Sequence, residues 1–316
     1  MKIKIFGTRG STSISNPDSI KYGGNTTCIR VMDDSIPDNV ALVVDAGSGF
    51  APMGKEIMKN NIKDHIQILF THFHWDHTIG LLTSPLTFIK NFHIDLFGPL
   101  ENGVGSKELL EHLMHKPYFP VDVRDVRSHF EFHGTKSIGS KVMLIHKNEV
   151  PRLIDIDHYE LAIKYDENLE MGRGKYPLKD FIVVKMYRTN HPEKTISYRF
   201  ENMEDGKVFV FLTDHENTDG ISTALYNHCK DADLLIMDSQ YTTEKYENGY
   251  AGFGHATPDY CVKLAQKCNV KKLGLTHHDP ESTDKDIDRM VKMANLYKNK
   301  SGLEIFACAD YMEIDI

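Results

Sequence analysis

Short apolar runs, each bounded by polar or turn-forming residues, recur from one end of the chain to the other. Apolar runs of about four to eight residues that are rich in Val, Ile and Phe are typical of buried β-strands. They predict strands at Lys2–Gly7, Cys28–Met32, Val40–Asp45, Ile66–Thr71, Phe92–Phe97, Lys141–His146, Phe181–Tyr187, Thr195–Phe200, Lys207–Thr213, Leu234–Asp238, Lys272–Thr276 and Glu304–Cys308.

Four segments between these runs show helical spacing of their apolar residues instead. Pro258–Lys267 follows Thr257, a residue type suited to an N-cap, and Lys285–Tyr297 follows a Ser-Thr-Asp start. The other two are Ala51–Lys59 and Ser106–Leu113. Because strands are followed by helices in both halves of the chain, the pattern predicts a layered α/β protein.

The 316 residues contain neither a Pro/Gly/Ser-rich linker nor an internal repeat, so we expect one domain spanning residues 1–316. The least regular stretch, about residues 100–180, is where an insertion covering a site is expected. No apolar run reaches the roughly 18 residues of a membrane helix, and the first residues alternate like a strand. These features predict a cytoplasmic protein. The five cysteines are scattered without a C-x-x-C pair, so no disulfide framework is expected.

Four metal-binding side chains occupy six positions directly after the predicted strand Ile66–Thr71. They are His72, His74, Asp76 and His77. Imidazole nitrogens and carboxylate oxygens without cysteine suit zinc, manganese or iron better than they suit a thiolate structural site. The cluster therefore predicts a catalytic metal site. Phe73 and Trp75 alternate with these residues, and we expect them to pack beneath the loop and not to touch a substrate.

Histidine and aspartate also follow other predicted strands. The residues concerned are Asp45, His191, Asp214 and His277. Strand ends in α/β proteins commonly converge on one edge of a sheet, so these side chains are expected to join the first cluster. Taken singly, each histidine also fits an ordinary surface or core position. Asp214 has His215 beside it as an alternative participant.

The H-x-H-x-D-H cluster, followed by isolated His, Asp and His after later strands, resembles the metallo-β-lactamase-fold hydrolases. Within that superfamily the chain is most similar to phosphodiesterase-type members, which include the tRNA 3′-end-processing nucleases and small-molecule phosphodiesterases. Residues that support this likeness are Gly7-Thr8-Arg9-Gly10-Ser11, Tyr22-Gly23-Gly24-Asn25-Thr26, Met237-Asp238-Ser239-Gln240-Tyr241 and Gly254-His255-Ala256-Thr257-Pro258. The resemblance implies a four-layer αββα sandwich that holds two divalent metal ions.

The resemblance also implies a role for each candidate residue. By the family pattern, one metal would be bound by His72, His74 and His191, the other by Asp76, His77 and His277, with Asp214 bridging them and Asp45 orienting a ligand or the metal-bound water. Zinc is expected first, with manganese and iron as alternatives. Two divalent ions carry four positive charges, and the two carboxylates neutralise only two of them. This centre is therefore cationic within a chain of net charge −8.

Such a centre suits phosphodiester hydrolysis. A hydroxide between the two metals would attack phosphorus in line while the metals neutralise the phosphate oxygens. We expect His255 to protonate the leaving alkoxide and Asp238 to set the tautomer of His255. The tRNA-processing family usually has His-Glu-Ala-Thr where this chain has Met237-Asp238-Ser239-Gln240, and the Gly/Pro-rich arm of that family is not recognisable. A small phosphodiester, such as a cyclic nucleotide or cyclic sugar phosphate, is therefore the expected substrate.

Three alternatives remain: a tRNA 3′-processing endonuclease, a thioester or lactone hydrolase on the same fold, and a metal-binding sensor without turnover. The segment Gly254-His255-Ala256-Thr257 favours phosphoryl over acyl chemistry, and the presence of Asp214 and His255 favours an enzyme over a sensor. The net charge of −8 and the lack of a basic run make nucleic acid the less favoured partner. No membrane partner is expected. The chain is expected to form a homo-oligomer.

Overall fold

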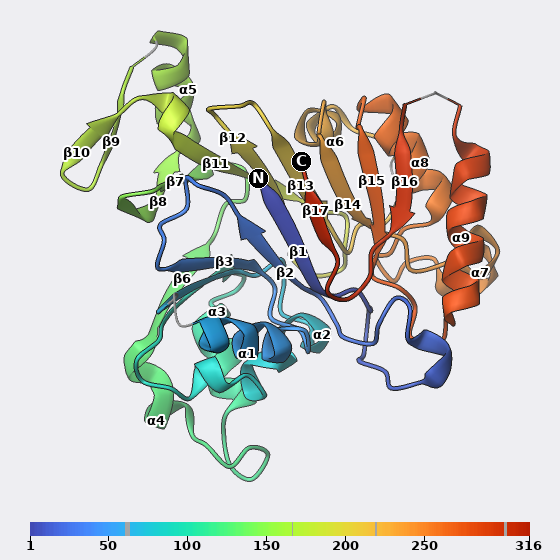
Figure 1. Cartoon of the computed structure of the whole chain (residues 1–316), viewed down its shortest axis with the longest axis horizontal. Coiled ribbons are helices and arrows are strands. Elements are labelled where there is room, and N and C mark those ends of the chain that lie inside the picture. The colour runs from blue at the N-terminus through green and yellow to red at the C-terminus, as the bar shows by residue number, and fades with distance from the viewer. Residues whose placement is uncertain (61–63, 166, 219, 300–301) are drawn as a thin grey trace.

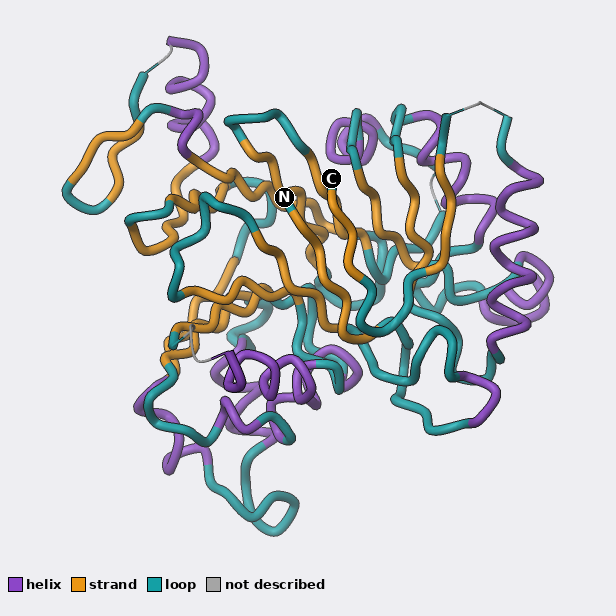
Figure 2. Tube along the Cα trace, viewed as in Figure 1, coloured by secondary structure: helices purple, strands orange, loops and turns teal. Residues whose placement is uncertain are grey.

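In the computed structural model, two β-sheets pack face to face between outer layers of helices (Figures 1 and 2). The structure describes residues 1–60, 64–165, 167–218, 220–299 and 302–316. Within these ranges the first sheet has the strand order β17-β1-β2-β3-β4-β5-β6. Its strands are β1 Lys2–Gly7, β2 Cys28–Met32, β3 Val40–Val44, β4 His65–Leu69, β5 His93–Pro99, β6 Phe130–Thr135 and β17 Glu313–Asp315.

The second sheet has the order β16-β15-β14-β13-β12-β11-β7-β8. Its strands are β7 Lys141–His146, β8 Glu149–Asp155, β11 Phe181–Arg188, β12 Ile196–Asn202, β13 Val208–Leu212, β14 Leu234–Asp238, β15 Lys272–Thr276 and β16 Glu304–Ala307. A separate hairpin pairs β9 Leu169–Met171 with β10 Gly174–Tyr176. Each of the twelve predicted strands is present, with ends shifted by at most two residues.

The helices are α1 Phe50–Asn60, α2 Trp75–Thr78, α3 Ser106–Leu113, α4 Val123–Val126, α5 Ile156–Tyr165, α6 Thr223–Cys229, α7 Thr243–Lys245, α8 Pro258–Lys267 and α9 Asp284–Tyr297. The four predicted helices correspond to α1, α3, α8 and α9. Thr257 stands at the N-cap of α8, although its side chain makes no capping hydrogen bond. None of the helices in the described ranges is long and apolar enough to cross a membrane.

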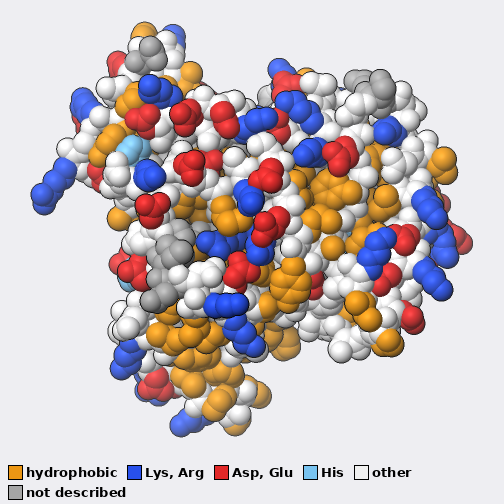
Figure 3. Space-filling view, viewed as in Figure 1, with side chains coloured by type: hydrophobic (Ala, Val, Ile, Leu, Met, Phe, Trp, Pro, Cys, Tyr) orange, Lys and Arg blue, Asp and Glu red, His pale blue; other side chains and the backbone are white. Residues whose placement is uncertain are grey.

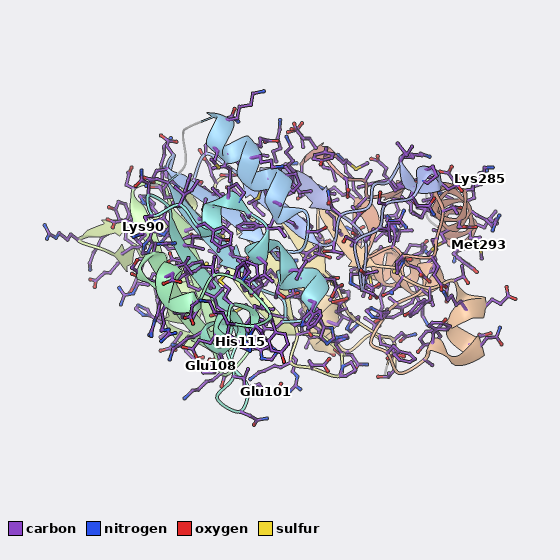
Figure 4. All side chains as sticks on the ribbon, turned by 90° about the horizontal axis from the view of Figure 1, so that it is seen from below. Lys90, Glu101, Glu108, His115, Lys285 and Met293 are labelled. Carbon is purple, nitrogen blue, oxygen red and sulfur yellow. The ribbon has the colours of Figure 1, made fainter. Side chains whose placement is uncertain are left out.

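Three apolar cores hold the four layers together. The central core lies between the sheets and contains residues such as Ile5, Val44 and Phe209. One outer core joins α1, α3 and α4 to the first sheet, and the other joins α6 and α8 to the second sheet. Strands such as β3 and β13 are buried along their whole length, because parallel strands inside a sandwich are covered on both faces. In the view from below, Glu108 of α3 and Lys285 of α9 lie towards opposite ends of the molecule (Figure 4).

The segment of residues 100–180 contributes to three parts of the molecule. Helices α3 and α4 cover the first sheet, and β6 and β7 are edge or near-edge strands of the two sheets. The remainder, from β8 through α5 to β10, stands out from the sandwich at the upper left of Figure 1. Its side chains make a core of their own against β7 and β11, in which Tyr159 and Leu169 are buried. We propose that this protruding part is the insertion, and that the chain is otherwise a single domain.

Two hydrogen bonds join the sheets beside the ends of their strands. The Tyr198 hydroxyl on β12 donates to the carbonyl oxygen of Phe70 at 2.7 Å, and the Ile196 amide donates to the carbonyl oxygen of Thr71 at 2.9 Å. Both Tyr198 and Phe70 are buried, so water does not replace these donors. The bonds fix the loop after β4 against the second sheet.

Replacing Tyr198 by Phe removes one of these donors and retains the ring. We expect Tyr198→Phe to lower the free energy of unfolding by about 1 kcal/mol, because a buried carbonyl oxygen loses its hydroxyl donor. Urea unfolding measures the effect. Tyr118→Phe is the matched control, since Tyr118 is 81% exposed. Equal stability of the two variants would contradict a role for the Tyr198 hydroxyl.

Candidate metal centre

The candidate residues meet where strand ends of both sheets face each other. In the first sheet β3 and β4 are parallel, and in the second β13, β14 and β15 are parallel. The carboxyl ends of these strands lead into Asp45, residues 72–77, Asp214, Asp238 and His277. The edge that they form is therefore supplied by five separate segments of the chain.

Three of these strand ends turn sharply. Asp45, Asp214 and His277 have φ values of 59°, 50° and 58°, in the left-handed region. Such a conformation is uncommon for residues other than glycine and costs about 1–3 kcal/mol at each position. Because of this conformation, the backbone turns immediately after each strand, and the side chains are directed across the edge of the sheet.

A first group consists of His72, His74 and His191, whose candidate ligand atoms all lie within 4.8 Å of one another. His72 and His191 are buried, and the Nε2 atom of each lacks a hydrogen-bond partner. Burial lowers the pKa of His72 well below its usual value, and the neighbouring histidines lower it further. A neutral imidazole with an unshared lone pair is the form that binds a metal ion.

A second group consists of Asp76, His77 and His277. The Oδ2 atom of Asp76 lies 3.3 Å from His77 Nε2 and 3.2 Å from His277 Nε2. The two Nε2 atoms are 3.3 Å apart. These separations match the distance between neighbouring ligands around one tetrahedral ion, which is roughly 3.3 Å for metal–ligand bonds of about 2.0 Å.

Asp214 lies between the two groups. Its Oδ2 atom is 3.3 Å from His72 Nε2 and 3.0 Å from His77 Nε2, and its Oδ1 atom is 3.1 Å from His277 Nε2. Burial would raise the pKa of Asp214, but the surrounding imidazoles hold it well below its usual value. The Oδ2 atom of this buried carboxylate has no hydrogen-bond donor, and a bound cation satisfies such an atom.

All seven predicted ligand residues are thus brought together, and their donor set fits divalent ions. His215, the alternative to Asp214, points elsewhere. Its Nε2 atom lies 3.1 Å from the Tyr260 hydroxyl on α8, and its Nδ1 atom accepts a hydrogen bond from the Asn190 amide.

Side chains behind the ligands hold their rings in place. Asp45 Oδ2 accepts a hydrogen bond of 2.8 Å from His77 Nδ1, while its two oxygens also accept from the amide and hydroxyl of Thr71. Gln240 Oε1 accepts from His277 Nδ1 at 3.0 Å. In both rings Nδ1 is engaged by these oxygens, which turns Nε2 towards the group. Asp45 thus contacts His77 from behind the group, and its orienting role stays a prediction.

His255 and Asp238 lie beside Asp214. His255 Nδ1 is 3.0 Å from Asp238 Oδ2 and 3.5 Å from Asp214 Oδ1. Asp238 also accepts hydrogen bonds from the amides of Gln240 and Ala256, which fix its orientation. Burial lowers the pKa of His255, but the two carboxylates outweigh burial and raise it to about 10.

A cleft of about 490 Å³ opens over the centre, and its lining includes Asp214, His255, Tyr241, Phe253 and Trp75. The Trp75 side chain is 67% exposed and Phe253 is 58% exposed. The expectation that Trp75 packs beneath the loop is therefore wrong, because α2 begins at Trp75 and turns its ring outwards. Phe73 does pack inwards on Phe70, with ring centroids 5.7 Å apart, although it also borders the cleft.

Several residues that contact the site are not among its predicted members. The Ser11 amide donates to Asp76 Oδ2 at 2.7 Å, and Glu193 Oε2 lies 3.1 Å from His74 Nε2 and 3.4 Å from His191 Nε2. Buried Glu216 accepts hydrogen bonds from the Gly252 and Gly254 amides, which fixes the loop before His255. The sequence signal for Glu193 is its position two residues after His191, and that for Ser11 is its place in the Gly7–Ser11 motif.

Gly254 presses closely against His191. Its carbonyl oxygen accepts from His191 Nδ1 at 3.3 Å, and its φ of 90° lies in the region that favours glycine. A Cβ atom at Gly254 would collide with His191 Nδ1, whereas one at Gly252, where φ is 92°, meets nothing within 4 Å.

Gly254→Ala should therefore displace His191 and weaken metal binding, while Gly252→Ala introduces similar backbone strain and leaves His191 in place. Both variants are dialysed against limiting zinc, and their metal content is then compared by elemental analysis. If both variants lose the same amount of metal, backbone strain explains the loss, and the proposed collision with His191 is refuted.

Comparison with known proteins agrees with this geometry. Residues 163–278 match the family model of the Beta-lactamase superfamily domain. The chain is similar to Ribonuclease Z of Thermoplasma acidophilum, with 25% identity over 286 residues that cover 84% of this chain and 87% of that protein. It also resembles the solved structure of the metallo-β-lactamase fold protein YhfI from Bacillus subtilis, with a TM-score of 0.62 and 14% identity over 99% of both chains. A second similar structure is that of human tRNase Z, short form, with a TM-score of 0.59 and 18% identity over 100% of this chain and 99% of that one. The chain has the metallo-β-lactamase fold, and its sequence is similar to that of a tRNA-processing member of the superfamily, Ribonuclease Z.

Proposed function

We propose that the protein is a hydrolase of small phosphodiesters that works with two divalent ions, zinc first among them. The observation that carries the proposal is the position of Asp214, whose two carboxylate oxygens face both imidazole groups at 3.0 to 3.3 Å. One ion would be held by His72, His74 and His191, the other by Asp76, His77 and His277, and both by Asp214.

When bound, paired divalent ions supply a nucleophile at neutral pH and offset negative charge on a phosphoryl group. The side chains of the protein position the ligands and the substrate. The buried ligands His77 and His277 are held from behind by Asp45 and Gln240, so the donor atoms are already in place before substrate arrives. The cleft above them admits the phosphodiester.

His255 is the proposed general acid. Its Nδ1–H donates to Asp238, which leaves Nε2 as the nitrogen that can hand a proton to a departing alkoxide. The ring borders the cleft and stands beside Asp214, so it would lie within reach of a leaving group that departs on that side of the centre. Asp238 acts through His255, as a positioning residue.

The cleft supports a substrate that carries a flat ring. Trp75 and Phe253 are largely exposed at its rim, and exposed aromatic rings offer stacking surfaces to nucleobases. The face seen in Figure 3 mixes acidic and basic side chains over the two sheets, and the chain as a whole carries a net charge of −8. Neither feature supplies the phosphate-tracking basic stripe of a nucleic-acid groove. Together they support a cyclic nucleotide or a comparable small diester.

Cleavage of tRNA 3′ ends is the second candidate. It is favoured by the similarity to Ribonuclease Z, which extends over 84% of this chain and 87% of that protein. The aromatic rim of the cleft suits an RNA end as well as a free nucleotide. The segment that protrudes from β8 to β10 offers additional surface, but its sequence lacks the Gly/Pro-rich pattern of the tRNA-binding arm.

Metal removal tests the reaction class, and a substrate panel tests the substrate. Protein dialysed against a chelator should lose hydrolysis of bis(p-nitrophenyl) phosphate and of cyclic nucleotides, and zinc or manganese should restore it. Asp214→Asn should lower metal content and reduce kcat/KM by roughly 100-fold or more, as expected when both ions lose a shared ligand. Asp38→Asn is the control, because its side chain is 88% exposed.

Full activity of the metal-free protein would refute the metal-dependent mechanism. Faster turnover of a precursor tRNA than of every small diester, compared as kcat/KM, would replace the first candidate by the second. A metal-loaded protein that hydrolyses a thioester or lactone but no diester would overturn both.

The role of His255 predicts a dependence on the leaving group. His255→Gln should reduce kcat/KM by roughly 100-fold or more for diesters with alkoxide leaving groups, which need a proton. The loss should be much smaller for p-nitrophenyl esters, whose leaving group departs as an anion. Metal content of the variant and the exposed control His158→Gln establish that the centre is intact. Equal losses with both kinds of leaving group would exclude proton donation by His255.

A further inference from the structure

A second cluster of histidines lies on the first sheet, at the opposite end of its strands from the centre described above. We propose that His65, His93, His133 and Asp95 form an additional binding site for a divalent transition-metal ion, separate from the catalytic centre. The inference does not depend on the proposed phosphodiesterase activity.

The register of three neighbouring parallel strands brings these residues together. His65 on β4 is paired with His93 on β5, and Gln67 is paired with Asp95. On the other side of β5, Asp95 is paired with Glu131 and Phe97 with His133 on β6. Alternate residues of a strand share a face, so His65, His93, Asp95 and His133 all project from the same side of the sheet.

This face is the inner face of the sandwich, because Leu69 and Phe97 on the same side belong to the core between the sheets. The side chains of His93 and His133 are 40% and 35% exposed, whereas Asp95 is buried. A solvent ion can therefore reach the imidazoles, while the carboxylate lies behind them.

The three imidazoles present their Nε2 atoms to Asp95. His65 Nε2 is 2.7 Å from Asp95 Oδ2, and His93 and His133 Nε2 are 3.3 and 3.7 Å from Asp95 Oδ1. The ligand atoms of His65, His93 and Asp95 all lie within 4.8 Å of one another. Three neighbouring strands of the first sheet thus bring together three imidazole nitrogens and one carboxylate.

An independent observation shows that hydrogen bonding alone leaves this set incomplete. Asp95 Oδ2 accepts hydrogen bonds from His65 and Gln67, but the buried Oδ1 has no donor with acceptable geometry. Leaving a buried carboxylate oxygen unpaired costs free energy. An ion bound by Oδ1 and the nearby Nε2 atoms of His93 and His133 removes that cost.

The donor types define the class of ion. Imidazole nitrogens with one carboxylate oxygen suit zinc, cobalt, nickel or copper, whereas magnesium and calcium prefer sites made of oxygen atoms. Glu131, 3.5 Å from His93 and 3.8 Å from His133, adds a carboxylate at the rim. The expected ligands therefore come from β4, β5 and β6, of which β6 is the edge strand.

An ion at this position would tie the edge strand to its two neighbours. His65 and His72 are seven positions apart in the sequence. At a rise of about 3.3 Å per residue, this corresponds to roughly 23 Å along an extended chain. At that distance the ion makes no contact with a substrate at the catalytic centre. Its expected effect is on the stability of the first sheet.

Zinc titration of the full chain tests the proposal. Chelator-treated wild-type protein should bind one more equivalent of zinc than a His65→Gln, His93→Gln double variant, as measured by elemental analysis after gel filtration. Zinc should also raise the thermal unfolding midpoint of the wild type further than that of the variant, because binding to the folded state stabilises it. His158→Gln, which changes an exposed histidine outside the cluster, should match the wild type.

If the double variant does not fold, His93→Gln alone serves, since that side chain is 40% exposed. Cobalt gives a second readout, because the visible absorption of the wild type should contain a component that the variant lacks. Equal zinc stoichiometry and equal cobalt spectra in the wild type and the variant would overturn the proposal.

Discussion

The burial of charge at the meeting edges of two sheets is the constraint on which this molecule depends. Asp214 is 1% exposed, and Asp45 and Asp238 are completely buried close to it. Carboxylates in such surroundings are stable only when cations or hydrogen-bond donors oppose them. Imidazoles, backbone amides and the Thr71 hydroxyl do so in the structure, and divalent ions would bind the atoms of His72, His191 and Asp214 that have no hydrogen-bond partner.

This constraint explains why the strands are so strongly apolar. Three left-handed turns are strained, and the buried carboxylates are desolvated. Both cost free energy, so the sheets must be stable enough to hold the five strand ends in place. Continuous buried strands such as β3, β13 and β14 supply that rigidity, and the inter-sheet bonds of Tyr198 and Ile196 act right beside the site. The arrangement is an example of local strain held in place by a well-packed scaffold.

The sequence pattern reveals those parts of the fold that are buried on both faces. It predicts β3, β13 and β14 because their apolar runs are uninterrupted over at least four residues. It misses β6 and β8, where charged residues such as Glu131 and Arg152 alternate with apolar ones at sheet edges and only one face is covered. It also misses α5, whose apolar positions face a small local core beside the protruding hairpin.

The candidate site was predictable to the extent that its residues follow strands. The ligand candidates are recognised by their density at residues 72–77 and by their place after strands. Gln240, Ser11 and Glu193 act through geometry that only the folded chain provides, since Ser11 contributes a backbone amide. The outward turn of Trp75 was not predictable from alternation, because the extended segment ends there and a helix begins. The histidines of β4, β5 and β6 are far apart in the sequence and become neighbours only through strand register.

The pairing of β17 with β1 brings Ile314 next to Ile3 within the first sheet. His277 and the parallel strands β15 and β16 likewise belong to the last part of this sequence, whereas residues 72–77 are made early. During synthesis on a ribosome, the early histidines therefore remain an incomplete set until His277 has emerged from the exit tunnel. A nascent chain that has not yet exposed His277 therefore holds only part of the proposed set of metal ligands.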